Sequence, residues 1–165
     1  MYKFNIYAFP NLISGLIDIL IGLFVLLKNR RSAINISFFL MTLSVFFWQI
    51  GTFFVLISST PELALSWSRN TYLGSSFIPI TTYAFIMSFL GRIKEEKRIL
   101  IFGFVITTLF ILPLSRTSSF LSGVYDFPWG YWFKSGPTHP IFLIFAILLF
   151  GDGLFKLLSS LTKEK

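Results

Sequence analysis

Two aspartates stand inside long apolar runs of the 165-residue chain, Asp18 in the first run and Asp152 in the last. An ionised carboxylate inside a bilayer is costly, so either residue is a candidate for a proton or cation relay. The alternative is a structural role, with the carboxyl protonated, hydrogen-bonded or reaching a lysine at the membrane surface. Neither run holds a basic residue at its middle, which favours the structural role for both. Asp152 precedes Lys156 by four residues on one helix face, which favours it more strongly.

Other residue types that carry chemistry are scarce. His139 is the single histidine and the chain has no cysteine, so neither a zinc-site spacing nor a thiol nucleophile is present. The sequence also lacks a glycine-rich phosphate loop and a GxSxG motif. Glu95 and Glu96 stand among basic residues, where solvated charge pairs are expected. The sequence therefore predicts a non-enzymatic protein without a metal or other cofactor.

The candidates for ligand binding are aromatic and polar residues that gather in one half of the expected bundle, which holds all four tryptophans. One interpretation is a pocket in which Arg69 holds an anionic group while aromatic rings pack an apolar body. The other is a girdle of interface anchors, with the arginine side chain extending to lipid phosphate. The candidate ligand-binding residues are Trp48, Gln49, Trp67, Arg69, Tyr72, Trp129 and Tyr131.

The elements that position these residues follow from composition. Hydrophobic residues make up 55% of the chain and charged residues 13%, too few for the surface of a soluble domain. The pattern predicts an all-α, polytopic integral membrane bundle, with the lipid bilayer as its main partner. The net charge of +7 does not indicate nucleic-acid binding, because the basic residues cluster in short links between apolar runs.

About five transmembrane helices are expected in one domain covering residues 1–165, since a span needs about 20 apolar residues. Four spans with a peripheral fifth segment are the alternative. An outer aromatic loop is expected over residues 115–140. The predicted helices are 6–27, 34–57, 72–90, 99–114 and 141–158.

The basic residues predict the orientation. Ten of the fourteen lysines and arginines lie in "KNRR", "GRIKEEKR" and the tail after Phe155. The positive-inside rule places these segments in the cytoplasm. We therefore expect a multi-pass protein of the plasma or inner membrane, with its N-terminus outside and its C-terminus in the cytoplasm.

Small residues recur every seven positions in the first two predicted helices. Such a stripe keeps facing one partner and permits close backbone approach in lipid. We expect the two stripes to pack the first helix against the second. The stripe residues are Ala8, Gly15 and Gly22, then Ser37, Ser44, Gly51 and Ser58.

A proline falls within the third predicted helix. Pro79 has no backbone N–H and its ring crowds the preceding turn, so a helix kink is expected there. The nearby hydroxyls of Ser75, Ser76, Thr81 and Thr82 offer partners for the backbone groups that the kink releases.

The densest aromatic stretch, "DFPWGYWFKSGPTHP" (126–140), lies in the predicted outer loop. The loop has about 26 residues, a length at which loops are usually functional or disordered. Its aromatic content disfavours disorder. We expect a structured cap over the helix ends, with Trp129 and Trp132 facing the interface or a pocket.

Three separated stretches resemble one family. The stretch "SWSRNTYLGSSFIPITTYAFIMSFLGR" (66–92) resembles the seven-transmembrane N-terminal sensor region of bacterial histidine kinases, also found ahead of diguanylate cyclases. The resemblance extends upstream to "FFLMTLSVFFWQIG" (38–51) and downstream into the aromatic loop. The residues that carry it are Trp67, Arg69, Tyr72, Gly74, Pro79, Phe85, Gly91 and Arg92, then Phe38, Trp48 and Gly51, then Gly130, Tyr131, Lys134, Gly136 and Pro137.

The resemblance implies a membrane-embedded sensory input module of two-component signalling, truncated after its fifth helix and lacking its catalytic output domain. The expected partners are a small-molecule or lipid-like ligand on the outer side and a cytoplasmic signalling partner or a second copy of the chain. The alternative is a subunit of a small oligomeric transporter or channel, in which Asp18 would matter more than Arg69.

Overall fold

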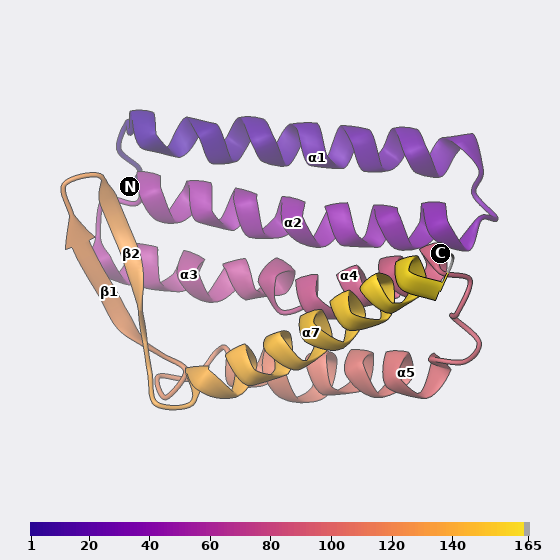
Figure 1. Ribbon diagram of the computed structural model, residues 1–165. Coiled ribbons are helices and arrows are strands. Elements are labelled where there is room, and N and C mark those ends of the chain that lie inside the picture. Colours follow the sequence, from indigo (N-terminus) through magenta and orange to yellow (C-terminus); the bar gives the residue numbers. More distant parts are fainter. Residues whose placement is uncertain (164–165) are drawn as a thin grey trace.

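The computed structural model describes residues 1–163 and shows a helical bundle with a β-hairpin across one end (Figure 1). Four helical segments of the described chain are long and apolar enough to span a membrane: Ile6–Lys28, Ala33–Ile57, Lys97–Leu114 and His139–Thr162. The predicted all-α polytopic membrane fold is confirmed. The elements are η1 (Ile6–Ala8), α1 (Phe9–Lys28), α2 (Ala33–Ile57), α3 (Pro61–Ser75), α4 (Ile78–Phe89), α5 (Lys97–Ile106), the π-helical turn η2 (Thr107–Ile111), α6 (Leu112–Leu114), β1 (Leu121–Phe127), β2 (Gly130–Ser135) and α7 (His139–Lys163).

The third apolar segment differs from the single helix expected over residues 72–90. Helix α3 begins eleven residues earlier, at Pro61, where the Thr60 hydroxyl accepts a hydrogen bond from the Leu63 N–H at 3.3 Å. The helix ends at Ser75, and α4 begins at Ile78. Together α3 and α4 run beside α2 and add a further pass to the bundle (Figure 1).

The interruption between α3 and α4 has a covalent cause. Pro79 is the second residue of α4 and cannot donate to the carbonyl one turn earlier, so the α-helical hydrogen bonds stop before it. The Phe77 N–H instead bonds to the Gly74 carbonyl at 2.9 Å, which tightens the last turn of α3. Where the sequence predicted a kink at Pro79, the structure therefore has two helices.

The expected outer loop, 115–140, contains an antiparallel hairpin. Strands β1 and β2 pair Tyr125 with Trp132 and Phe127 with Gly130, leaving a two-residue turn at the tip. Gly130 has φ of 126°, a conformation that L side chains rarely adopt. Asn5 fixes the hairpin tip, because its side-chain amide donates to the Leu56 carbonyl at 2.8 Å and to the Trp129 carbonyl at 2.9 Å.

The small-residue stripes pack differently from the expectation. On α1, Gly15 and Gly22 face α2, but they meet Gln49 and Thr42 rather than the α2 stripe. The α2 stripe faces the other way. A Cβ on Gly51 would lie 2.9 Å from the Cα of Thr71 in α3. Helices α1 and α2 do pack against each other, as predicted, but the α2 stripe packs against α3 instead of α1. Helix α2 is therefore the central helix, with one heptad face for α1 and another for α3.

Helix α7 crosses the bundle and packs mainly against α4 (Figure 1). The contact is a buried cluster in which Leu149 meets Ile80, Tyr83 and Met87. Between α7 and the α5–η2 helix lies an apolar groove of about 520 Å³. The groove is lined by Ile99, Phe102, Gly103, Ile106, Phe110, Ile111, Ile141, Ile144, Phe145, Leu148 and Leu149.

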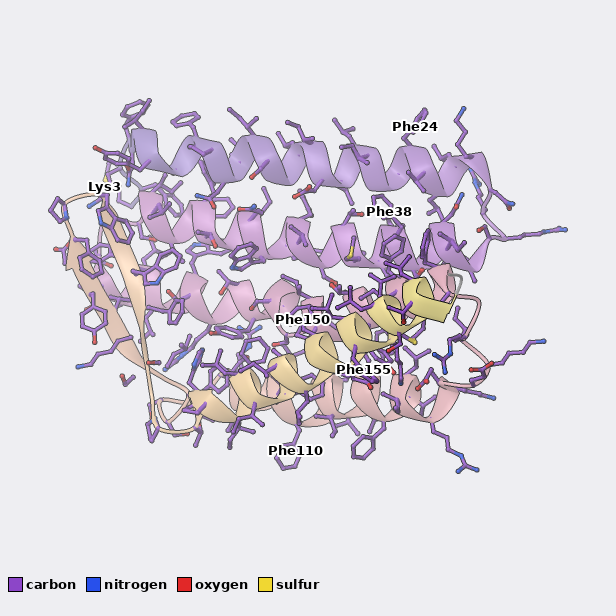
Figure 2. All side chains as sticks on the ribbon, viewed as in Figure 1. Lys3, Phe24, Phe38, Phe110, Phe150 and Phe155 are labelled. Atoms are coloured by element: carbon purple, nitrogen blue, oxygen red, sulfur yellow. The ribbon has the colours of Figure 1, made fainter. Side chains whose placement is uncertain are left out.

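The outer faces of the helices carry exposed apolar side chains, as the lipid-facing surface of a membrane bundle must. Phe24 and Phe110 project away from the bundle (Figure 2), and about two thirds of the surface of each residue is exposed. The α1–α2 link, the α4–α5 link and the C-terminal end of α7 lie at the end opposite the hairpin (Figure 1).

We predict that Gly74→Ala destabilises the bundle. A Cβ at Gly74 would come within 2.9 Å of the Phe47 carbonyl carbon and would meet further α2 backbone atoms, so α3 must move away from α2. The expected loss is about 1–3 kcal/mol, seen as a lower midpoint of thermal unfolding in detergent.

Gly151→Ala is the matched control for this variant. A Cβ at this helical position on α7 meets nothing within 4 Å, so its midpoint should stay the same or rise slightly. Equal midpoints for both variants would contradict the close approach of α2 and α3.

Candidate functional site

An aromatic-lined pocket of about 460 Å³ lies beneath the hairpin, between α2, the α3–α4 interruption, β2 and α7. Its walls are mainly apolar, with a few hydroxyl and imidazole groups. A pocket of this size and lining is typical of sites for small apolar ligands. The lining residues are Trp48, Thr71, Tyr72, Ser75, Ile78, Pro79, Trp132, Phe133, His139, Phe142, Leu143, Ala146 and Phe150.

A buried polar pair lies in the wall of this pocket. The Tyr72 hydroxyl is 2.7 Å from Nε2 of His139, and both side chains are more than 90% buried. Three phenylalanine rings surround Tyr72 edge-on, with ring centroids 4.9–6.5 Å from its own. The pair therefore places hydrogen-bonding atoms in an otherwise aromatic wall and joins α3 to the first residue of α7.

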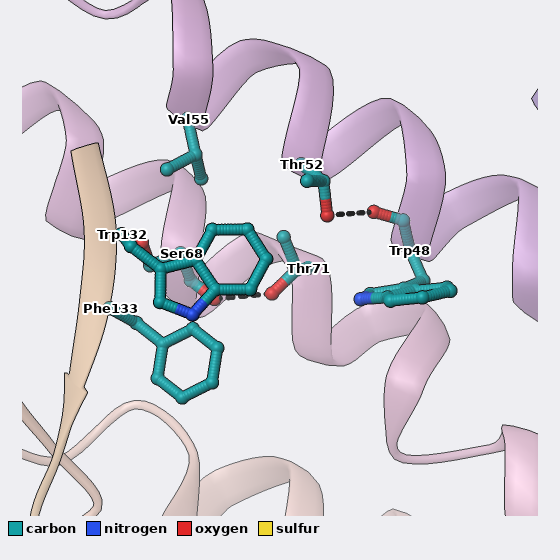
Figure 3. A pocket seen from close by; sticks show the side chains of 7 residues that line it. All are labelled: Trp48, Thr52, Val55, Ser68, Thr71, Trp132 and Phe133. Carbon is teal, nitrogen blue, oxygen red and sulfur yellow. Dashed lines mark hydrogen bonds between the residues drawn. The ribbon is translucent and has the colours of Figure 1, made fainter. Parts of the chain in front are cut away.

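A small cavity of about 20 Å³ adjoins the pocket (Figure 3). Its volume fits about one water molecule. The Thr52 hydroxyl donates to the Trp48 carbonyl at 2.9 Å and the Thr71 hydroxyl donates to the Ser68 carbonyl at 2.6 Å. Both hydroxyl oxygens can still accept a hydrogen bond from a molecule in the cavity. Trp48, Thr71, Trp132 and Phe133 line both spaces, so the cavity extends the pocket toward α2.

The structure divides the residues that the sequence grouped as ligand-binding candidates. Trp48 and Tyr72 line the aromatic pocket. Gln49 does not, because its Cβ lies toward α1, 3.1 Å from where a Cβ on Gly15 would stand. Arg69 does not either: it lines a separate cleft on α3.

The other three candidates hold the hairpin and the chain start in place. Trp67 stacks on Phe54 with ring centroids 4.1 Å apart, and its indole N–H donates to the Tyr2 hydroxyl at 3.0 Å. Tyr131 is buried among α2 and α3 side chains. Trp129 lies at the exposed hairpin turn.

Sequence reasoning missed several pocket residues. Trp132 reaches the pocket from β2, as the expected cap allowed. The residues that were not predicted there are Phe133 on β2 and His139 and Phe142 on α7. A signal for the strand was present, because "DFPWGYWF" places a two-residue Pro-Trp turn between aromatic runs that favour strands. His139 had no comparable signal, since its role depends on the hairpin bringing α7 beside Tyr72.

A second polar site lies at the opposite end of α7. The Lys156 ammonium is 2.7 Å from Glu96, 2.7 Å from Asp152 and 2.8 Å from the Tyr83 hydroxyl. Three ammonium hydrogens thus meet three acceptors. The Tyr83 hydroxyl lies 3.0 Å from Glu96 and 2.8 Å from Asp152, and its proton bridges to one of them. The cluster joins α4, the start of α5 and α7.

Two expectations from the sequence concern residues of this cluster. The pairing of Asp152 with Lys156 is present in the structure. Glu96 is not a solvated charge, as the sequence suggested: it is buried and paired with Lys156 across the bundle, because the turn before α5 directs it inward. Its neighbour Glu95 is exposed and pairs with Arg92 at 2.9 Å.

The remaining acidic candidate has a simpler environment. Asp18 lies on the same face of α1 as Gly15 and Gly22, toward α2, and is half-buried. Among the described residues, its carboxyl group has no hydrogen-bond or ion-pair partner. In the same part of the chain, no three His, Asp or Glu side chains come together in a metal-binding arrangement.

A family model described as the N-terminal 7TM region of histidine kinase matches residues 10–165. The chain belongs to this family. No curated protein and no solved structure matched the chain. The match confirms the resemblance predicted from the three sequence stretches. The chain is thus a histidine-kinase sensor region in a multi-pass membrane protein, a kind of region that is not itself catalytic.

The residues that carried the family resemblance have separate structural roles in this sensor region. Gly74 permits the close approach of α3 to α2, and Pro79 follows the break between α3 and α4. Tyr72 lies in the pocket wall. The residues that the chain shares with the family therefore include some that shape the break between α3 and α4, some that pack α3 against α2, and some that line the pocket.

We predict that Glu96 makes the stability of the sensor region pH-dependent. The hydrogen bond from Lys156 lowers the pKa of the Glu96 carboxyl below its ordinary value of 4.5. Its stabilising effect is then fully present above about pH 4.5 and is lost as the pH falls through the lowered pKa. Glu96→Gln should lower the unfolding midpoint at pH 7 and flatten its fall between pH 5 and 3.

Glu95→Gln is the control, because it removes the same charge one residue away at an exposed position. Its unfolding profile should follow the unmodified chain. A Glu96→Gln profile identical to that of Glu95→Gln would show that the buried pairing is absent.

Proposed function

We propose that this sensor region detects an apolar molecule in the aromatic pocket and passes the signal along α7. One observation carries the proposal: α7 forms one wall of the pocket and bears the Lys156 cluster at its other end. A ligand in the pocket therefore contacts the helix that leads to the C-terminal end of the chain.

The lining of the pocket suggests the class of ligand. Indole and phenyl rings favour an apolar body, and the Tyr72–His139 pair offers a hydrogen-bonding group to one polar end. The pocket lies at the hairpin end of the bundle. A small molecule or lipid-like compound with a hydroxyl or carbonyl end fits this chemistry best.

The mechanism we propose is a population shift between two positions of α7. A ligand that binds one position about 100-fold more tightly than the other shifts the equilibrium by about 2.7 kcal/mol. His139 and Ala146 would contact the ligand, and Lys156 would keep or lose its partners on α4 and α5. The cluster is a discrete contact with two states, formed and broken.

The orientation in this proposal has the hairpin outside and the opposite end in the cytoplasm. Its support is the positive charge of the α1–α2 and α4–α5 links, which lie at the same end as the C-terminal part of α7 (Figure 1). The signal then travels inward.

The output would come from a kinase or cyclase domain outside these residues, on the same chain or on a partner, and a second copy of the chain would be a natural partner for such a domain. The coding sequence next to this chain tests the point. An adjacent kinase or cyclase supports the proposal, and a gene neighbourhood devoted to transport would argue against it.

Ligand binding is tested with a long-chain bromoalkanol, whose bromine quenches nearby tryptophans. In a Trp67→Phe/Trp129→Phe background, Trp48 and Trp132 report on the pocket. We expect saturable quenching, weakened about tenfold by Ala146→Phe, which fills the pocket from α7.

Ile147→Phe is the matched control for Ala146→Phe, because it adds a ring to the next residue of α7, which is exposed and outside the pocket. Quenching that does not saturate, or that is the same in both variants, would indicate that the bromoalkanol only partitions into lipid. This result would contradict the proposal.

Orientation is tested by single-cysteine labelling, which the cysteine-free sequence permits. Ser122→Cys lies on the hairpin and Lys94→Cys in the α4–α5 link; both positions are exposed. A membrane-impermeant maleimide should label only Ser122→Cys in intact spheroplasts and both variants after lysis. The reverse pattern would invert the proposed direction of signalling.

A further inference from the structure

We propose that a second site at the hairpin end of the bundle binds an anionic phosphate group. The site is a cleft of about 470 Å³ lined by Glu62, Leu65, Ser66, Arg69 and Arg116. It shares no lining residue with the aromatic pocket, so the inference does not depend on the proposed function.

Two separate parts of the chain bring the arginines to one cleft. On α3, Glu62, Ser66 and Arg69 follow at helical spacings of four and three residues and so share a face. Arg116 follows the end of α6 in the turn that leads to the hairpin. Its guanidinium donates to the Asn70 side-chain oxygen at 2.6 Å, which holds it beside α3.

The arginine donors are not used up by carboxylates. Within residues 1–163 neither Arg69 nor Arg116 forms an ion pair, and Nε of Arg69 is buried without a hydrogen-bond partner. A guanidinium carries five N–H donors, of which the Asn70 bond occupies one on Arg116. The two arginines and the single carboxylate of Glu62 leave the cleft with a net charge of about +1.

The donors and charge fit a phosphate group. Planar guanidinium groups bind phosphate oxygens in pairs, and two of them can hold one phosphate from two sides. The cleft lies at the end of the α5–α6 span, where the head groups of a bilayer would begin. The phosphate could belong to a lipid head group or to a free anion, and Leu65 provides an apolar contact for a lipid.

The test measures binding to the purified full chain in detergent by thermophoresis. The probes are inorganic phosphate, short-chain phosphatidylglycerol and short-chain diacylglycerol, which lacks phosphate. Arg69→Gln and Arg116→Gln should each weaken phosphate-group binding about tenfold. Glu62→Gln should strengthen it about threefold, because a repelling charge is removed.

Arg92→Gln is the charge-matched control, because Arg92 lies in the α4–α5 link at the opposite end of the bundle. Its affinity should be unchanged. Glu62 and Arg116 are exposed, so their variants test the site even where Arg69→Gln does not fold.

The three probes distinguish the source of the phosphate. Binding of phosphatidylglycerol but not of inorganic phosphate assigns the cleft to a lipid head group; the opposite result assigns it to a free anion. Either supports the proposal. Equal binding of diacylglycerol, or phosphate affinities unaffected by Arg116→Gln and Glu62→Gln, would overturn it.

Discussion

The close contact between α2 and the broken α3–α4 segment is the constraint on which the rest of the structure depends. Lipid chains are as apolar as leucine, so helices in a bilayer associate through tight packing and hydrogen bonds rather than through exclusion of water. Gly74 and Gly51 let the backbones of α2 and α3 approach. That contact positions both helices of the segment. Helix α3 places Tyr72 in the pocket beneath the hairpin, and α4 places Tyr83 in the Lys156 cluster.

The apolar spans could be predicted from the sequence because their hydrophobic runs match the thickness of a bilayer. The start of α3 could not, because "PELALSWSRN" is too polar for a span and is helical through its Thr60 cap and its packing on α2. The small-residue period was visible as well. Its partner was not, since a heptad stripe specifies a face of a helix but not which neighbour occupies that face.

In the candidate site, too, locally signalled features could be predicted and features set by distant partners could not. Trp48 and Tyr72 were predicted because the placement of aromatic residues in one half of the bundle is visible in the sequence. His139 and Glu96 gain their roles only through residues more than ten positions away, Tyr72 in one case and Lys156 in the other. Local patterns in one sequence do not reveal which distant side chains will meet, so they gave no signal for the burial of His139 and favoured a solvated Glu96.

The apolar groove between α7 and the α5–η2 helix has a practical consequence. Protein side chains leave about 520 Å³ open there, an apolar space that the acyl chains of lipid molecules can enter in a bilayer. The lipids are then part of the solvation of α7, much as ordered water is part of a soluble core. Acyl-chain length and saturation thus become experimental variables in their own right, and detergent and bilayer preparations are different thermodynamic systems for this helix.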